Sequence, residues 1–109
     1  MTVQLSGPIA AYFKAADAAL PDDVAAAFAP DAEVRDEHQT HRGRVAIAAW
    51  ARDTIGRYRM KADPLESAVA DDGRIVTARV TGDFPGSPLV FTYRFTLADE
   101  AITALEISL

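Results

Sequence analysis

Apolar residues recur at helical spacing near the start of the chain. A first helix is predicted to begin at Ser6 or Gly7, because Pro8 suits a first turn, where its missing N–H is not needed. The apolar face of this helix consists of Ile9, Tyr12, Phe13 and Ala16. This spacing therefore predicts an amphipathic first helix.

A second, short helix is predicted to begin at Pro21, since Asp22 and Asp23 favour the N-terminal end of a helix. We expect Phe28 on its apolar face and its end at Pro30. A third helix is predicted from about Arg44 to Tyr58. Its inner stripe consists of Ile47, Trp50, Ala51, Thr54 and Tyr58.

Between the last two helices, and again after Tyr58, the period of the pattern changes to two. Ala32 to Glu37 alternates, with Ala32, Val34 and Asp36 on one side, and a turn with a short return strand follows. Further strands are predicted over residues 60–69, 74–82, 89–97 and 101–109. Asp71-Asp72-Gly73 reads as a hairpin turn, and residues 83–88 read as a loop rich in proline and glycine.

Helices first and hairpins later indicate a single α+β domain over residues 1–109. We expect the helices to cover one face of a curved antiparallel sheet. A cavity should remain wherever the helices do not fill the curve, and such a cavity is the default ligand site. The residues predicted to line it are Phe13, Val34, Trp50, Tyr58, Phe84, Phe91 and Leu105.

Charge and composition narrow the function classes. The net charge of −5 disfavours a nucleic-acid binder. Arg35 to Lys61 is locally basic, which is typical of a solvated helix face. The chain has no cysteine, so a disulfide scaffold and a cysteine nucleophile are excluded. No apolar run is long enough to span a bilayer, and no secretory signal is apparent. We therefore expect a cytoplasmic protein that does not contact membranes.

Asp36 is the most informative polar residue, because alternation places it on the apolar side of its strand. Desolvation there would raise its pKa and make it a stronger base. The alternative is a strand-end position at which Asp36 is hydrogen-bonded or paired with Arg42 or Arg44. His38 and His41 flank the following turn; their spacing fits no metal motif, so no metal or other cofactor is predicted, whereas an acid–base role beside Asp36 stays open.

Several segments together carry a family likeness. They are Tyr12-Phe13, the run from Phe28 to Asp36, Arg42-Gly43-Arg44, Ile47 with Trp50, and Ile102 with Leu105. Through them the chain resembles the nuclear transport factor 2-like superfamily, especially its ketosteroid-isomerase-like and SnoaL-like (polyketide cyclase) branches. The resemblance implies a cone-shaped, strongly curved antiparallel sheet with three helices enclosing a pocket, and a homodimer formed through the outer sheet face.

The resemblance also implies roles for individual residues. In ketosteroid-isomerase-like proteins, a tyrosine on the first helix donates to the substrate oxygen and a carboxylate at the end of the first strand shuttles the proton. Tyr12 and Asp36 occupy these positions. The second acid of that family is replaced by Tyr93, which needs a one-residue gap in the alignment. This departure argues against steroid isomerase activity itself.

Two hypotheses follow for the function. In the first, the protein binds a small apolar molecule and transfers a proton next to a carbonyl group, as an isomerase, cyclase or dehydratase without a cofactor. Asp36 would be the base, and Tyr12 and Tyr93 the hydrogen-bond donors. In the second, the domain is a non-catalytic ligand-binding or dimerisation module, and Asp36 points away from any cavity.

Overall fold

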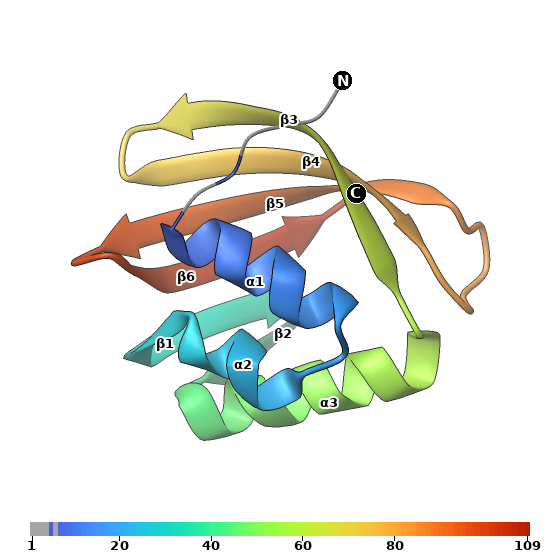
Figure 1. The fold of residues 1–109 in the computed structure, drawn as a ribbon, viewed down its shortest axis with the longest axis horizontal. Helices are drawn as coiled ribbons and strands as arrows, with labels where there is room; N and C mark the ends of the chain where they lie inside the picture. Colours follow the sequence, from blue (N-terminus) through green and yellow to red (C-terminus); the bar gives the residue numbers. More distant parts are fainter. Residues whose placement is uncertain (1–4, 6) are drawn as a thin grey trace.

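The computed structural model describes residue 5 and residues 7–109 and contains three helices and six strands in the order shown in Figure 1. The helices are α1 (Gly7–Asp17), α2 (Pro21–Ala26) and α3 (Arg44–Tyr58). The strands are β1 (Phe28–Asp36), β2 (Gln39–Arg42), β3 (Lys61–Ala70), β4 (Gly73–Thr81), β5 (Leu89–Ala98) and β6 (Ala101–Ser108). Ser6, one of the two residues predicted to start the first helix, lies outside the described residues.

The strands form one curved sheet in the order β2-β1-β6-β5-β4-β3, and the three helices lie on one face of it (Figure 1). The sheet does not close on itself. The predicted α+β class is therefore confirmed, with the curved sheet and three helices expected from the resemblance. One detail differs from an all-antiparallel sheet: β1 pairs with β6 in parallel, while the other neighbouring strands are antiparallel.

The boundary between the second helix and the first strand was predicted wrongly. Phe28 was expected on the helix face, but α2 ends at Ala26 and Phe28 begins β1, where it lies opposite Ile102 of β6. Pro30 was expected to end the helix and instead lies inside the strand. The strand register shifts between Phe28 and Glu33, and such an irregularity tolerates a proline that cannot donate to the ladder. Pairing with the last strand thus overrides the local helical pattern.

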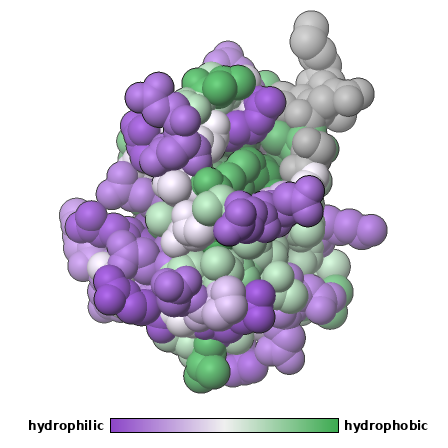
Figure 2. Space-filling view, turned by 90° about the vertical axis from the view of Figure 1, so that its left-hand side faces the viewer, coloured by the Kyte–Doolittle hydropathy of each residue, from purple (hydrophilic) through white to green (hydrophobic). Residues whose placement is uncertain are grey.

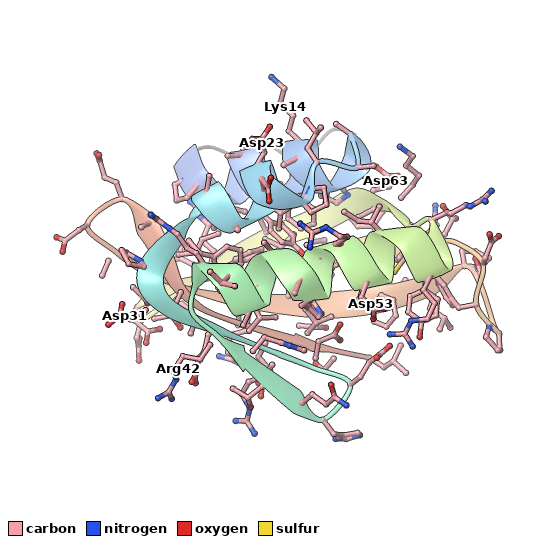
Figure 3. All side chains as sticks on the ribbon, turned by 90° about the horizontal axis from the view of Figure 1, so that it is seen from below. Lys14, Asp23, Asp31, Arg42, Asp53 and Asp63 are labelled. Atoms are coloured by element: carbon pink, nitrogen blue, oxygen red, sulfur yellow. The ribbon has the colours of Figure 1, made fainter. Side chains whose placement is uncertain are left out.

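The core lies between the helices and the inner face of the sheet. Its largest fully buried side chains are Phe28, Phe95, Ile47, Ile102, Leu105, Val24, Val34, Val76 and Val80. Charged side chains lie outside it, and the labelled Lys14, Asp23, Asp31, Arg42, Asp53 and Asp63 project from the surface in Figure 3. Among the described residues, no helix is long and apolar enough to cross a membrane.

The basic segment from Arg35 to Lys61 is largely neutralised at the surface. Arg35 faces Glu106 at 3.9 Å, Arg42 contacts Glu33 at 2.8 Å, and Arg52 lies 3.7 Å from Asp22. These contacts fit the interpretation of the segment as a solvated surface. On the outer face of the sheet, Ile75, Thr77, Thr92 and Thr96 are half-buried beside exposed arginines. The homodimer expected through this face stays a prediction.

Candidate functional site

A cavity of about 220 Å³ lies at the C-terminal end of α1, between the helices and the sheet. Its floor is formed by buried side chains, including Tyr12, Phe13, Trp50, Val80 and Tyr93. Its rim is more exposed and consists of Asp17, Glu37, Tyr58, Phe84 and Pro85. Because α1, β1, α3 and the strands β3 to β6 all contribute, the cavity exists only in the complete fold.

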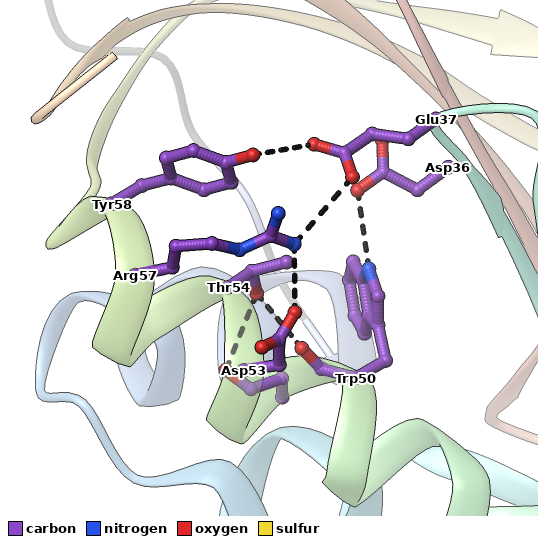
Figure 4. A network of polar contacts seen from close by, with 8 residues as sticks. Asp36, Glu37, Trp50, Asp53, Thr54, Arg57 and Tyr58 are labelled. Atoms are coloured by element: carbon purple, nitrogen blue, oxygen red, sulfur yellow. Dashed lines mark hydrogen bonds and ion pairs between the residues drawn. The ribbon is translucent and has the colours of Figure 1, made fainter.

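Asp36 occupies the wall of this cavity at the end of β1, and Figure 4 shows its contact with α3. The indole Nε1 of Trp50 donates a hydrogen bond to Asp36 Oδ2 at 3.1 Å. Burial raises the pKa of the Asp36 carboxyl, the Trp50 hydrogen bond lowers it, and the nearby charge of Glu37 raises it again. The net shift is upward, so Asp36 is a stronger base than an exposed aspartate.

Of the alternatives for Asp36 at a strand end, the structure shows the hydrogen-bonded one and not the ion pair. Arg42 is held by Glu33, and the Nε of Arg44 donates to the backbone carbonyl of Phe28 at 2.9 Å. Neither guanidinium reaches Asp36, which takes the hydrogen bond of Trp50 instead. The carboxylate is therefore held by a neutral donor and keeps its basicity.

Tyr12 and Tyr93 bring two hydroxyl groups to the same cavity. Both side chains are 5% exposed, their rings lie 6.2 Å apart, and the hydrogen bonds of the site use neither hydroxyl. Within residues 5 and 7–109, no side-chain nitrogen or oxygen is both sealed from solvent and without a partner. Both residues line the cavity, and neither hydroxyl has a hydrogen-bond partner among the described residues, so each can donate to a ligand there.

The charge on Asp36 contributes to a raised pKa at both tyrosine hydroxyls. Burial raises the pKa of Tyr12, and so do Tyr93 and Asp36; burial and then Asp36 raise the pKa of Tyr93. Both phenols therefore stay protonated, which is the form that can donate a hydrogen bond. The structure thus brings together the three residues predicted as base and donors, and their catalytic roles stay a prediction.

A network of polar contacts crosses the rim next to Asp36 (Figure 4). The Tyr58 hydroxyl donates to Glu37 Oε1 at 3.1 Å, and the Arg57 guanidinium lies 3.7 Å from Glu37 and 2.7 Å from Asp53. The same guanidinium lies 4.6 Å from the centre of the Tyr58 ring. These contacts tie the turn after β1 to the end of α3 and fix one side of the entrance.

Another part of the rim is fixed by the loop after β4, which is also anchored on Tyr58. The Asp83 amide donates to the Tyr58 carbonyl at 2.6 Å, and the Gly82 amide donates to Ser87 Oγ at 3.0 Å. A Cβ at position 82 would lie 2.7 Å from the same Tyr58 carbonyl, so glycine is needed for this close approach. Phe84 is thereby placed 6.1 Å from the Tyr58 ring, centre to centre.

The lining predicted from sequence is found in part. Phe13, Trp50, Tyr58, Phe84 and Phe91 all lie on the cavity wall. The placement of Val34 and Leu105 there was wrong. These two residues lie opposite each other across the β1–β6 pair and are 0% and 1% exposed, so they belong to the closed core.

Two carboxylates of the rim, Asp17 and Glu37, were missed. Strict alternation assigned Glu37 to the outer face of its strand. In the structure the strand ends at Asp36, Glu37 (φ 53°) and His38 (φ 64°) form the turn to β2, and Glu37 lines the rim of the cavity. Asp17 was overlooked because it follows the last apolar residue of its helix; its Oδ1 accepts a hydrogen bond from the Ala62 amide. Turn residues after a strand were the available signal for Glu37.

The two histidines differ in position. His38 is exposed in the turn, whereas His41 of β2 is half-buried, with its ring 6.1 Å from the Trp50 ring. The charge of His41 lowers the pKa of Asp36, but this is the weakest of the influences on it. Neither histidine lines the cavity. In the part of the chain that the structure describes, no three acidic or histidine side chains are grouped to hold a metal.

A second hollow lies at the other end of α1, and Figure 2 shows hydrophobic residues gathered between hydrophilic ones on that side. Leu5, Ile9, Phe28 and Leu97 line it. Its charged groups are Arg44, Arg74 and Glu100, and Arg44 is already bound to a backbone carbonyl. Among the described residues that line it, none brings a hydroxyl to face the Glu100 carboxylate, so the cavity around Asp36 is the better candidate site.

Comparison with known families agrees with this architecture. Residues 9–105 match the model of the SnoaL-like domain. The chain belongs to the SnoaL-like domain family. No curated protein matches the sequence of this SnoaL-like domain.

Solved structures show the same fold. A proposed polyketide cyclase from Sinorhizobium meliloti is 42% identical, with a TM-score of 0.91 over 95% of each chain. A protein with a ketosteroid isomerase-like fold from Catenulispora acidiphila, solved with trimethylamine, is 20% identical; the match covers 100% of this chain and 87% of that one, with a TM-score of 0.83. The fold and the cavity are those of a small-molecule pocket protein.

Proposed function

We propose that this SnoaL-like domain is an enzyme that transfers a proton at the carbon next to a carbonyl group of a small apolar substrate. The single observation that carries the proposal is the meeting of Asp36 with the free hydroxyls of Tyr12 and Tyr93 in one apolar cavity. The 42% identity to a proposed polyketide cyclase supports the same class of chemistry. Isomerisation, aldol cyclisation and dehydration all begin with this proton transfer.

The chemistry needs no group beyond those in the cavity. The Asp36 carboxylate takes the α-proton, so a C–H bond breaks and an O–H bond forms. The electron pair moves into a carbon–carbon double bond, and the carbonyl electrons move onto oxygen. The Tyr12 and Tyr93 hydroxyls donate to the resulting enolate oxygen. Asp36 then returns the proton to the same carbon or to a conjugated one. Alternatively, the enolate carbon attacks a second carbonyl and closes a ring, and Asp36 returns the proton to the alkoxide oxygen that forms.

The test is exchange of the α-protons of acetophenone for deuterium in D₂O, followed by NMR. The Asp36→Asn variant should exchange at least a hundredfold more slowly than the unmodified protein, the lower end of what a positioned base contributes. It should still bind the ketone, because the amide preserves shape. Tyr12→Phe and Tyr93→Phe should each slow exchange by a smaller factor.

The matched control is Asp63→Asn, which removes an exposed carboxylate of β3 away from the cavity and should leave the rate unchanged. Equal exchange by the Asp36→Asn variant would exclude Asp36 as the base. Binding without any exchange in the unmodified protein would instead favour a non-catalytic binding module.

A further inference from the structure

We infer that the cavity accepts an uncharged carbonyl compound with one or two rings and discriminates against anionic compounds of the same shape. This inference deepens the proposed function and rests on it for the carbonyl group. The limit on ligand size comes from the cavity volume, and the discrimination against anions comes from the charged residues of the wall. Ligand size and ligand charge are therefore tested with separate probes.

The volume of the cavity limits the ligand. At about 220 Å³ it exceeds the roughly 150 Å³ that holds a benzene molecule in an engineered protein core. It is smaller than the range of about 300–1,000 Å³ typical of sites for drug-sized molecules. The aromatic rings of Phe13, Trp50, Phe84 and Phe91 set this boundary. A one- or two-ring ketone fits, and a four-ring steroid does not.

The charges on the wall have one sign. Asp17, Asp36 and Glu37 line the cavity, and within the described residues no lysine, arginine or histidine does so. An anionic group that enters this space leaves water, meets carboxylates of its own sign and finds no counter-charge on the wall. An uncharged ligand avoids this desolvation and this repulsion. Its carbonyl oxygen can accept hydrogen bonds from the two tyrosine hydroxyls.

Two cations that contact rim residues are already engaged. The Arg57 guanidinium is held by Asp53 and Glu37, and its side chain is 50% exposed. The Lys61 ammonium donates to the backbone carbonyl of Asp17 on the outer side of the rim. To pair with a ligand anion, Arg57 would have to leave two carboxylates. The rim therefore does not offset the negative wall.

The experiment compares four probes: acetophenone, 2-acetylnaphthalene, 4-acetylbenzoate and a four-ring steroid ketone. Trp50 is the only tryptophan of the chain, and its indole N–H contacts Asp36 on the cavity wall. The single indole cross-peak in a ¹H–¹⁵N spectrum therefore reports occupancy without requiring turnover. We expect both neutral one- and two-ring ketones to shift this peak, 4-acetylbenzoate to bind at least tenfold more weakly than acetophenone, and the steroid to cause no shift.

Variants that remove one carboxylate test whether the cavity wall causes the discrimination against anionic ligands. Glu37→Gln should reduce the preference for acetophenone over 4-acetylbenzoate at least threefold. Glu106→Gln is the matched control, since it removes the same charge from an exposed position beside Arg35, and it should leave the preference unchanged. A preference below tenfold in the unmodified protein, or tight binding of the steroid, would overturn the inference.

The two proposals fail in distinguishable ways. If the neutral ketones bind selectively but no α-proton exchanges, the catalytic proposal fails and the inference about ligand class stands. If 4-acetylbenzoate binds and exchanges as fast as acetophenone, the catalytic proposal stands and the inference fails.

Discussion

One half of the interior is a packed core and the other half contains the cavity, and the same strands contribute side chains to both. In the closed half, Val34 of β1, Leu105 of β6 and Phe95 of β5 are fully buried. Two residues away on the same strands and on the same face, Asp36, Ile107 and Tyr93 line the cavity. A shift of two residues preserves the face of a strand and changes its surroundings from packed core to open space. Alternation therefore defines which way a side chain points, but not whether anything fills the space in front of it.

The largest expected difference between the halves concerns stability. Phe95→Ala should lower the free energy of unfolding by about 3–5 kcal/mol, since it opens a hole in a packed core. Phe91→Ala on the same strand only enlarges existing space and should cost less than half as much. Urea unfolding of the two variants measures both values. Equal losses would show that the two halves are packed alike and would break the comparison.

A smaller effect is expected at the hydrogen bond between α3 and β1. Trp50→Phe keeps an aromatic ring but removes the donor to Asp36, so it should cost about 1 kcal/mol of stability. Because this hydrogen bond lowers the pKa of Asp36, its loss should move that pKa further upward. Carboxyl-carbon NMR titration of Asp36 in both proteins measures the change, and Trp50→Tyr checks that ring size alone is not responsible. A downward shift would contradict the assigned contact.

The smallest effect is on the pH dependence of stability. The pKa of Asp36 is raised in the folded state above its usual 3.8, so between these two values the folded state binds more protons than the unfolded state. The contribution of this group is therefore fully present below pH 3.8 and is lost as pH rises through the folded pKa. Asp36→Asn should remove that loss and gain stability relative to the unmodified protein as the pH rises. Denaturation at several pH values checks the sign, with Asp63→Asn as the exposed control.

Much of the fold follows from periodicity, and the errors have physical causes. The helix from Arg44 to Tyr58 and the hairpin at Asp71-Asp72-Gly73 were predicted closely, because spacing and turn chemistry act locally. Phe28 was misplaced because its partner, Ile102, lies near the other end of the chain. A contact so distant in sequence leaves no local signal in a single chain.

The site was predictable to a similar extent. Asp36, Tyr12 and Tyr93 could be proposed from alternation and family resemblance, and the structure places all three on one cavity. Glu37 could not be proposed, since a turn with positive φ rather than the strand pattern directs it to the rim. The closed position of Val34 and Leu105 depends on how two strands pack together, which periodicity does not encode.

The position of β6 between β1 and β5 has a consequence for how the protein is made. Pairs of strands that are far apart in the sequence form slowly, because the intervening segment loses conformational entropy before the new contacts stabilise the chain. During synthesis, one edge of β1 stays unpaired until β6 leaves the ribosome. An unpaired strand edge favours aggregation during that time. Asp36 and Tyr93 consequently meet only when β6 inserts between their strands, so the chemistry of the cavity and the completion of folding depend on one and the same event.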